Sequence, residues 1–358
     1  MLLLITSHLN DPNNEYGGVV KSFPRFCEAI VKDVDRASVM GLMSQTTSLD
    51  PLLENNKKLK CIGLRSAFSK NRHAVSWQFI KIWNAIKNSD TVILNGFQNF
   101  LMTLCLLFCL VQRKQISVHF RGGLELNRQR LDTNYLKRLW NFLFLKSLLK
   151  NLNIIYCSSQ IEQRNIQEYL LQINFKYLGN MIIIENSVTN ENLTQKSKYS
   201  NTFKLLYFGR ISPEKRTDFL IEFATKNEWE LHLYGPIIRS NYKSQLLNNE
   251  MTGEKIFYNP PVNLSIIAEN ADKYDCFVNV SVSENFGNVF VEAAKIKLPI
   301  ISTKVGVLDR LISNEEFIPL EGFDLELELK AALKKLTNLT DAEKAKMARK
   351  ASNKLENP

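Results

Sequence analysis

Two carboxylates, eight residues apart, frame a predicted strand-to-helix turn. Glu284 follows a predicted strand, a turn spans Asn285–Gly287, and Glu292 lies about four residues into the next helix. The first N–H groups of a helix have no partner within that helix, so its N-terminus attracts anions. Carboxylates accept hydrogen bonds from hydroxyl groups. The segment therefore suits a diphosphate between a hexose and a ribose, although a helix cap and a solvated carboxylate would give the same pattern.

Two cations lie in a second segment, Gly209–Lys215, which reads GRISPEK and follows another predicted strand. Arg210 and Lys215 are separated by a turn that Pro213 favours. Because the strands of a parallel sheet end at one edge, these cations are well placed to neutralise a departing diphosphate. Taken alone, the pair fits two surface cations equally well.

The elements around these segments alternate between apolar strands and helices in both halves of the chain. This alternation predicts two doubly wound α/β domains, since 358 residues exceed what one hydrophobic core usually supports. The polar stretch Glu185–Asn201 predicts a linker, so we assign residues 1–185 to a first domain, 186–202 to the linker and 203–358 to a second domain. The expected strands are Leu2–Thr6, Ala37–Leu42, Thr91–Leu94, Ile116–His119, Ile154–Cys157, Lys204–Phe208, Leu231–Tyr234, Cys276–Val280 and Pro299–Thr303. The expected helices include Val19–Lys32, Tyr135–Lys150, Thr217–Thr225, Asn288–Lys297 and Asp341–Leu355.

Composition excludes several classes of protein. Apolar residues make up 45% and charged residues 23%, which is typical of a globular protein and not of a disordered one. The six cysteines include no C-x-x-C pair, so they indicate reduced thiols and not a zinc site. The opening MLLLITS lacks a basic flank and predicts a strand, not a signal peptide. The longest apolar run, Phe100–Val111, is too short to span a bilayer.

Positive charge is concentrated in the first half of the chain. Residues 1–180 hold 23 basic and 12 acidic side chains, a net charge of +11, whereas residues 181–358 have a net charge of −1. Such asymmetry suggests an anionic partner, which is a phospholipid surface, a pyrophosphate-linked substrate or nucleic acid, although solubility and chance explain the charge alone equally well. No nucleic-acid-binding motif is present. The basic, apolar helix Tyr135–Lys150 is interpreted as packing on its own sheet, with a position on a membrane surface as the alternative.

The two segments together resemble the retaining glycosyltransferases of family 4. GRISPEKRTDFLI is similar to that family's G-R-x-x-x-E-K block, and SENFGNVFVEAAKIKLPIIST is similar to its E-x7-E block. The resemblance extends to Gly17-Gly18, to SSQIE at Ser158–Glu162 and to YDCFVNVSVSE, and so covers most of the chain. It implies the GT-B fold, in which two Rossmann-like parallel-sheet domains face each other across a cleft. The first would bind the acceptor and the second the nucleotide sugar.

The resemblance also implies roles for individual residues. Arg210 and Lys215 would hold the donor diphosphate, and Glu284 would bind the donor sugar. His119, at the end of a first-domain strand, would face the donor sugar, and Arg121 would hold a phosphate of the acceptor or donor. The other implied donor-binding residues are Gly17, Gly18, Gly209, Asn285, Phe286, Gly287, Asn288, Val289 and, at the ribose, Glu292.

The implied reaction transfers a hexose or N-acetylhexosamine from a nucleotide sugar, with UDP favoured over GDP, to a hydroxyl of a saccharide acceptor, with retention. We expect no cofactor and no catalytic metal; Asp33-Val34-Asp35 is interpreted as a helix end. The resemblance and the charge suggest a lipid-linked acceptor in bacterial surface polysaccharide synthesis, such as lipopolysaccharide or capsule. They also suggest a cytoplasmic protein, peripheral to the inner face of an anionic membrane, without a nucleic-acid partner. A GT-B nucleotide-sugar epimerase and a non-catalytic carbohydrate-binding protein remain as alternatives.

Overall fold

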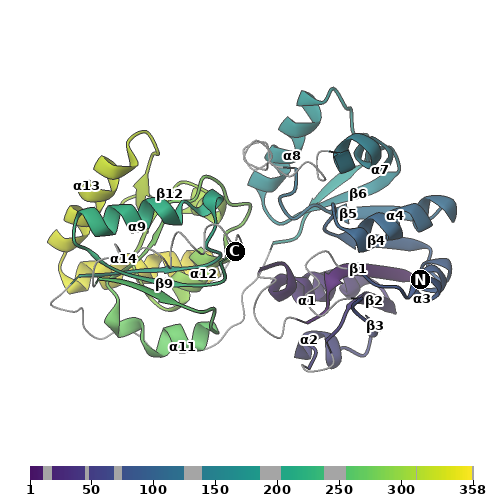
Figure 1. The fold of residues 1–358 in the computed structure, drawn as a ribbon, viewed down its shortest axis with the longest axis horizontal. Coiled ribbons are helices and arrows are strands. Elements are labelled where there is room, and N and C mark those ends of the chain that lie inside the picture. The colour runs from purple at the N-terminus through teal and green to yellow at the C-terminus, as the bar shows by residue number, and fades with distance from the viewer. Residues whose placement is uncertain are drawn as a thin grey trace. The chain divides into compact units, whose positions relative to one another are not determined.

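The computed structural model describes residues 1–10, 18–44, 48–67, 75–124, 139–185, 203–237, 255–311 and 313–356. The chain divides into two compact units, Met1–Asn186 and Ser187–Pro358 (Figure 1). The predicted linker, residues 186–202, lies outside the described residues. Each unit is built on a parallel sheet with helices on both faces, and this confirms the predicted doubly wound architecture of both halves.

The described strands of the first unit form a sheet in the order β3-β2-β1-β4-β5-β6-β7. They are β1 (Leu2–His8), β2 (Ala37–Leu42), β3 (Leu59–Leu64), β4 (Thr91–Asn95), β5 (Gln115–His119), β6 (Leu152–Cys157) and β7 (Asn180–Ile183). Successive side chains of a strand point to opposite faces, so Leu3 and Ile5 of β1 enter one hydrophobic cluster and Leu4 the other. A strand buried on both faces needs the nearly continuous apolar sequence that β1 has.

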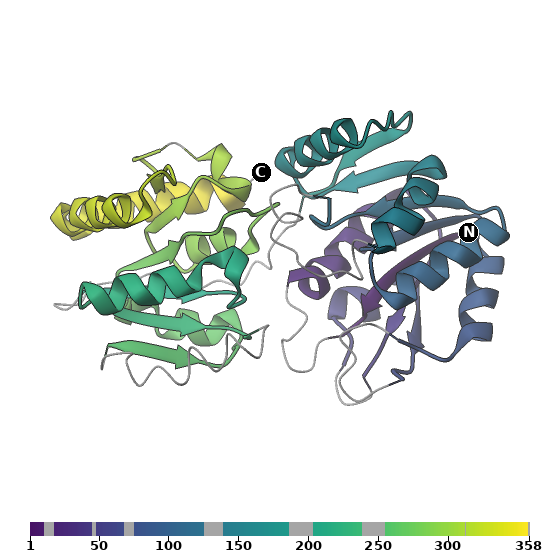
Figure 2. The same ribbon diagram turned by 45° about the horizontal axis from the view of Figure 1, so that its top comes forward.

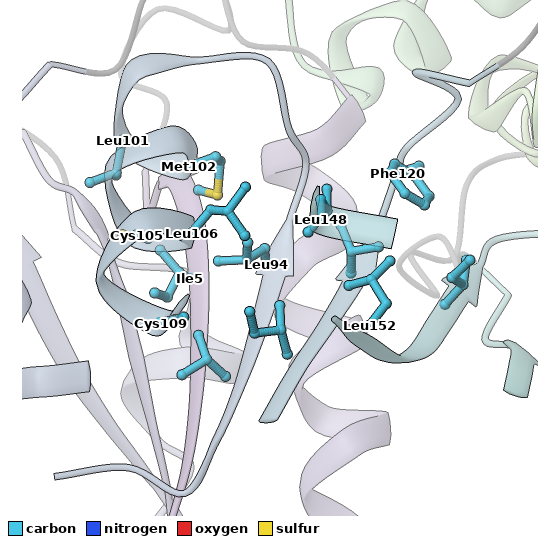
Figure 3. Close-up of a cluster of buried hydrophobic side chains, with 14 of the residues drawn as sticks. Ile5, Leu94, Leu101, Met102, Cys105, Leu106, Cys109, Phe120, Leu148 and Leu152 are labelled. Atoms are coloured by element: carbon cyan, nitrogen blue, oxygen red, sulfur yellow. The ribbon is translucent and has the colours of Figure 1, made fainter. Parts of the chain in front are cut away.

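Helices cover both faces of this sheet (Figures 1 and 2). They are α1 (Gly18–Ile30), η1 (Val31–Asp33), α2 (Pro51–Glu54), α3 (Phe79–Lys87), α4 (Phe100–Val111), the π-helical η2 (Asn141–Leu145), α7 (Lys146–Lys150) and α8 (Gln160–Gln172). One cluster contains side chains of α1 and α2, and the other contains side chains of α3, α4, α7 and α8. In Figure 3, Met102, Cys105 and Leu106 of α4 lie beside Ile5 and Leu94 of the sheet.

The described strands of the second unit form a parallel sheet in the order β10-β9-β8-β11-β12-β13. They are β8 (Lys204–Phe208), β9 (Glu230–Tyr234), β10 (Ile256–Asn259), β11 (Cys276–Asn279), β12 (Ile300–Thr303) and β13 (Ile318–Leu320). The helical segments are η3 (Pro213–Lys215), α9 (Thr217–Lys226), α11 (Leu264–Glu269), η4 (Ala271–Lys273), α12 (Asn288–Lys295), η5 (Gly306–Arg310), α13 (Leu325–Asn338) and α14 (Asp341–Glu356). α9 and α13 pack on one face of the sheet, and α11 and α12 pack on the other.

Two features differ from the sequence-based expectation. The strands β3, β7, β10 and β13 were not predicted, and each of them lies at an edge of its sheet. The predicted helix Tyr135–Lys150 is described only from residue 139, where η2 leads into α7. Leu148 and Leu149 of α7 are buried in the core, which supports the interpretation of this helix as packed on its sheet.

Candidate functional site

The strand order of the second unit places the predicted site at a change of chain direction in the sheet. From β8 the chain adds β9 and β10 on one side, and β11, β12 and β13 follow on the other side. β8 and β11 are parallel neighbours, so their carboxyl ends meet at one edge. In open α/β sheets, ligands bind at this edge where the strand order reverses. Arg210 and Lys215 follow β8, and Glu284 follows β11.

Two glycines let the turn after β8 lie close to the turn after β9. The Gly209 N–H donates a hydrogen bond to the Tyr234 carbonyl at 2.9 Å, and Gly209 has a φ of +143°. Gly235 has a φ of +149°, and a Cβ at this position would lie 1.8 Å from the Gly209 carbonyl oxygen. Only glycine avoids that overlap. This close approach fixes the backbone from which Arg210 extends.

The Arg210 side chain is 37% exposed and therefore accessible to a ligand. The backbone carbonyl oxygen of Arg210 accepts a hydrogen bond from the Tyr207 hydroxyl at 2.7 Å, and the Arg210 guanidinium lies 3.7 Å from Glu214 Oε1. Burial alone would raise the pKa of the Glu214 carboxyl, but Arg210 lowers it, and the net shift is downward. Glu214 is therefore an anion that orients Arg210. The Val282 N–H donates to the Glu214 carbonyl at 3.0 Å and joins the two motifs.

Lys215 and Glu284 form an ion pair at the centre of this edge. Lys215 Nζ lies 2.5 Å from Glu284 Oε1, and the two side chains are only 10% and 13% exposed. The Ser281 hydroxyl also donates to Glu284 Oε1 at 3.3 Å. Burial lowers the pKa of Lys215, and the facing carboxylate of Glu284 opposes this shift. The structure thus joins two residues that the sequence predicted separately.

The segment that carries Glu284 ends at the N-terminus of α12. Gly287 precedes the helix with a φ of +77°, and a Cβ there would lie 2.5 Å from the Phe290 ring. The Val307 N–H donates to the Phe286 carbonyl at 2.7 Å and holds the turn from the far side. α12 thus begins at Asn288, shortly after Glu284, with the positive end of its dipole at the carboxyl edge of the sheet.

The other predicted donor-binding residues have different surroundings. Phe286 is buried in the core of the second unit, so its contribution to a ligand site comes from its backbone. A Cβ at Gly209 would lie 3.5 Å from Val289 Cγ1, which places Val289 beside the turn after β8. Glu292 is half-buried on α12, and its place at a ribose remains a prediction.

His119 ends β5 in the first unit, and its side chain is fully buried. Its ring packs against Phe26 with 5.0 Å between the centroids, and Nε2 lies 3.5 Å from Glu162 Oε2. Burial and the nearby Arg121 lower the pKa of His119 to about 4, so the ring is neutral at pH 7. Its role toward a donor sugar remains a prediction, because the residues described around it belong to its own unit.

Arg121 is half-buried, and its guanidinium is held by side chains of its own unit. Its Nε donates to Asn95 Oδ1 at 2.7 Å, and one terminal nitrogen donates to the Ser22 hydroxyl at 3.0 Å. The guanidinium also lies 5.4 Å from the centre of the Phe26 ring. Burial lowers the pKa of Arg121 to about 10, so it is still a cation at pH 7. These contacts tie β4 and α1 to the segment after β5, and binding of a phosphate by Arg121 remains a prediction.

The sequence did not predict a role for Glu162, whose carboxylate joins the segments that follow β5 and β6 in the first unit. Glu162 Oε1 accepts the Gly122 N–H at 2.6 Å, and Oε2 accepts the N–H and the hydroxyl of Ser158, each at 2.6 Å. Burial opposes ionisation of this carboxyl, but the His119 ring and the Ser158 donors lower its pKa to about 2. The signal available in the sequence was a Ser-Ser pair followed by a glutamate after a strand, which is a capping pattern.

The two predicted glycines of the first domain are only partly described. Gly17 lies outside the described residues, and Gly18 is the first residue of α1. Of the remaining predicted residues, Arg210, Lys215, Glu284, Gly287 and Asn288 gather at one edge of the second unit, whereas His119 and Arg121 belong to the first unit.

A buried neutral histidine makes the stability of the first unit depend on pH. The pKa of His119 is lower in the folded state than its unfolded value of about 6.5, so its contribution is complete above that pH. We expect the free energy of unfolding to fall by up to about 1.4 kcal/mol per pH unit between about pH 6.5 and pH 4. Urea titrations followed by tryptophan fluorescence test this, with His119→Gln as the control that should flatten the slope. An equal slope in both proteins would contradict the assignment.

Comparisons with known proteins agree with this geometry. Residues 188–354 match the family model described as Glycosyl transferases group 1. An uncharacterised glycosyltransferase of Methanocaldococcus jannaschii, MJ1178, is 29% identical over 175 residues, which cover 47% of this chain and 45% of that protein. The match thus spans less than half of this relative.

Solved structures resemble the whole chain. Anabaena Alr3699/HepE in complex with UDP and glucose superposes with a TM-score of 0.71 and 16% identity, covering 99% of this chain and 94% of that one. A sucrose-phosphate synthase from Thermosynechococcus elongatus gives a TM-score of 0.73 with 16% identity and the same coverage. TarM gives a TM-score of 0.70 with 11% identity, covering 99% of this chain and 95% of that one.

These likenesses define the class of fold, and the chain has the GT-B fold with two parallel-sheet α/β units. Within this fold, residues 188–354 are similar to the glycosyl transferases of group 1. Together these findings support a GT-B glycosyltransferase.

Proposed function

We propose that the protein is a retaining glycosyltransferase of family 4. It transfers a hexose or N-acetylhexosamine from a nucleotide sugar to a hydroxyl group of a saccharide acceptor. The observation that carries this proposal is the arrangement after β8 and β11, where an accessible Arg210 lies beside the Lys215–Glu284 ion pair and the N-terminus of α12. Two cations and the positive end of a helix dipole suit a diphosphate, and a carboxylate beside them suits sugar hydroxyls.

The proposed reaction breaks the bond between the anomeric carbon and a diphosphate oxygen. The bonding electron pair leaves with the diphosphate, and Arg210, Lys215 and the N–H groups at Gly287 and Asn288 stabilise its charge. The acceptor oxygen attacks from the same face, and its proton passes to the departing phosphate oxygen. Glu284 holds the sugar hydroxyls throughout, and the neutral His119 ring would offer a hydrogen bond to the sugar.

A UDP sugar is the favoured donor. Alr3699/HepE binds UDP and glucose, and the pneumococcal GtfA structure holds UDP and GlcNAc. The test is a thermal-shift screen of UDP-glucose, UDP-GlcNAc and GDP-mannose, since a ligand at 100 times its Kd adds about 2.7 kcal/mol of stability. We expect one UDP sugar to raise the melting temperature of the wild type and to act less on Arg210→Ala. A screen in which no nucleotide sugar shifts the wild type would overturn the proposal.

Catalysis without a metal is part of the proposal, because Arg210 and Lys215 supply positive charge where the leaving group departs. Transfer is expected to continue in EDTA at more than half its original rate. Complete loss of transfer that Mg²⁺ or Mn²⁺ restores would show that the reaction depends on a metal.

We also propose that the acceptor is lipid-linked and that the enzyme acts in bacterial surface polysaccharide synthesis, at the inner face of the cytoplasmic membrane. In the described ranges, no helix combines the length and the apolar character needed to cross a bilayer. The net charge of +11 in residues 1–180 supports a peripheral position, since basic side chains near an anionic membrane are attracted to it.

A further inference from the structure

One helical layer of the first unit exposes apolar side chains on its outer surface. The Trp83 ring of α3 contacts Phe108 of α4 at 5.0 Å, and Trp140, next to η2, donates a hydrogen bond to Thr103 of α4. α3, α4 and the η2–α7 segment therefore form one layer. Its large exposed side chains, here called the apolar face, include Trp77, Ile80, Phe100, Leu107, Val111 and Leu143.

α4 shows why this surface is unusual. Its inner side is buried against the sheet, where Met102 and Cys105 lie (Figure 3). Its outer side has no charged group, because Thr103 is the only polar residue of the helix. Val111 at the end of α4 is 70% exposed, and Ile80 on the neighbouring α3 is 78% exposed. A helix that is apolar all round belongs in a protein core or against lipid.

The helices of the same layer carry basic side chains and no acidic ones. α3, α4, η2 and α7 contain no Asp or Glu. Basic side chains lie on α3, directly after α4, and on α7, and they are Lys81, Lys87, Arg113, Lys114, Lys146 and Lys150. Among the charged residues on these helices and directly after α3 and α4, only Asp90 is acidic, and it pairs with the N-terminal amine. Exposed apolar side chains among mainly basic ones are the pattern of a surface that lies on anionic lipid.

The apolar face also borders the edge of the sheet where His119 lies. Helices that connect parallel strands start at the carboxyl edge of the sheet, and α4 starts there with Phe100, shortly after β4 ends at Asn95. Ile80 likewise lies in the first turn of α3. A lipid surface on the apolar face would thus extend from the carboxyl ends of β4 and β5, where the acceptor is expected, to the opposite edge, where α4 ends at Val111.

We propose that the apolar face docks on an anionic phospholipid bilayer, which deepens the proposed function and rests on it for the lipid-linked acceptor. A second copy of this chain is a poorer occupant. A two-fold interface would bring the acid-free helices of two copies together, and Lys146 and Lys150 would meet like charges. The bilayer instead supplies both apolar volume and negative charge.

Co-sedimentation of the full chain with vesicles tests the proposal. Vesicles of phosphatidylcholine alone are compared with vesicles of equal parts phosphatidylcholine and phosphatidylglycerol. Wild-type binding should require phosphatidylglycerol and weaken steeply from about 0.05 M to about 0.5 M salt, since salt screens the attraction. The triple variant Ile80→Gln/Val111→Gln/Leu143→Gln should bind at least about tenfold more weakly. The matched control, Ile266→Gln/Phe323→Gln/Leu327→Gln, changes three exposed apolar residues of the second unit and should bind like wild type.

A second variant, Lys146→Glu/Lys150→Glu, keeps every apolar side chain and should also lose binding to the anionic vesicles. Equal binding to both kinds of vesicle, or full binding by the triple variant, would overturn the proposal. So would a concentration-dependent dimer that only the triple variant loses, because a second copy would then be the occupant. The nucleotide-sugar thermal shift is measured on the same preparations. If a nucleotide sugar still shifts the melting temperature but the vesicles bind no protein, the docking proposal fails and the proposed function stands. If the anionic vesicles bind the protein but no nucleotide sugar shifts its melting temperature, only the proposed function is rejected.

Discussion

Replacing Glu284 with alanine is expected to lower kcat/KM for sugar transfer by at least about a hundredfold. The carboxylate is proposed to hold two donor hydroxyls, and each hydrogen bond to a charged group is worth about 1.5–3 kcal/mol. Losing two such bonds at the lower figure corresponds to about 3 kcal/mol, or a factor of about a hundred. Steady-state rates of nucleotide release measure the effect, and turnover within twofold of wild type would reject the role of Glu284.

The same substitution also affects stability, because Lys215 then loses the carboxylate that lies 2.5 Å from its ammonium group in a site that is mostly buried. Removing one partner of a buried ion pair costs about 3 kcal/mol. Lys215→Met and the double variant Lys215→Met/Glu284→Ala complete a mutant cycle. The double variant should be more stable than the sum of the two single effects predicts. Activity is compared at a temperature where every variant is folded, so that loss of transfer is not loss of fold.

Replacing Arg210 with alanine should lower kcat by about a hundredfold and raise KM far less. The diphosphate gains charge mainly as the glycosidic bond breaks, so a cation that stabilises it acts on the transition state more than on the bound donor. Arg210 is 37% exposed, and its removal should therefore change the free energy of unfolding little. Arg210→Lys serves as the control that keeps the charge but loses the paired donors of the guanidinium.

Lys215→Ala should show the same kinetic pattern together with a loss of stability, since Glu284 would then be the unpaired partner. An unchanged kcat with a raised KM in the Arg210 variant would show that this cation only binds the ground state. That result would contradict the proposed stabilisation of the leaving group.

The sequence predicted the interior strands and missed those at the sheet edges. β2 is buried along its whole length and is apolar except for Ser38, which makes it easy to recognise. β3, β7 and β10 are largely half-exposed or exposed, and their sequences carry polar residues that weaken the pattern. β13 has only three residues, one of them Pro319. Each of these edge strands forms because it pairs with one neighbouring strand. The sequence of the edge strand alone does not contain that information.

The candidate site shows the same division between local and distant information. Lys215 and Glu284 were each recognisable because their motifs follow strands, but their contact depends on β8 lying next to β11. The contacts of His119 with Glu162 and of Arg121 with Asn95 likewise join residues from different helices and strands. Spacing along the chain indicates which residues are able to do chemistry. It does not indicate how each of them is held or how deeply it is buried.

The central claim is that the edge formed after β8 and β11 holds a nucleotide sugar and releases its diphosphate as the sugar is transferred. Its most direct test is to incubate the purified protein with the UDP sugar that stabilises it and a panel of saccharide and lipid-linked saccharide acceptors. Nucleotide release and the anomeric configuration of the product are followed together by NMR. The account predicts that UDP appears in step with a product that keeps the donor's configuration. An inverted linkage, or a protein that binds the UDP sugar but releases no UDP with any acceptor, would contradict it.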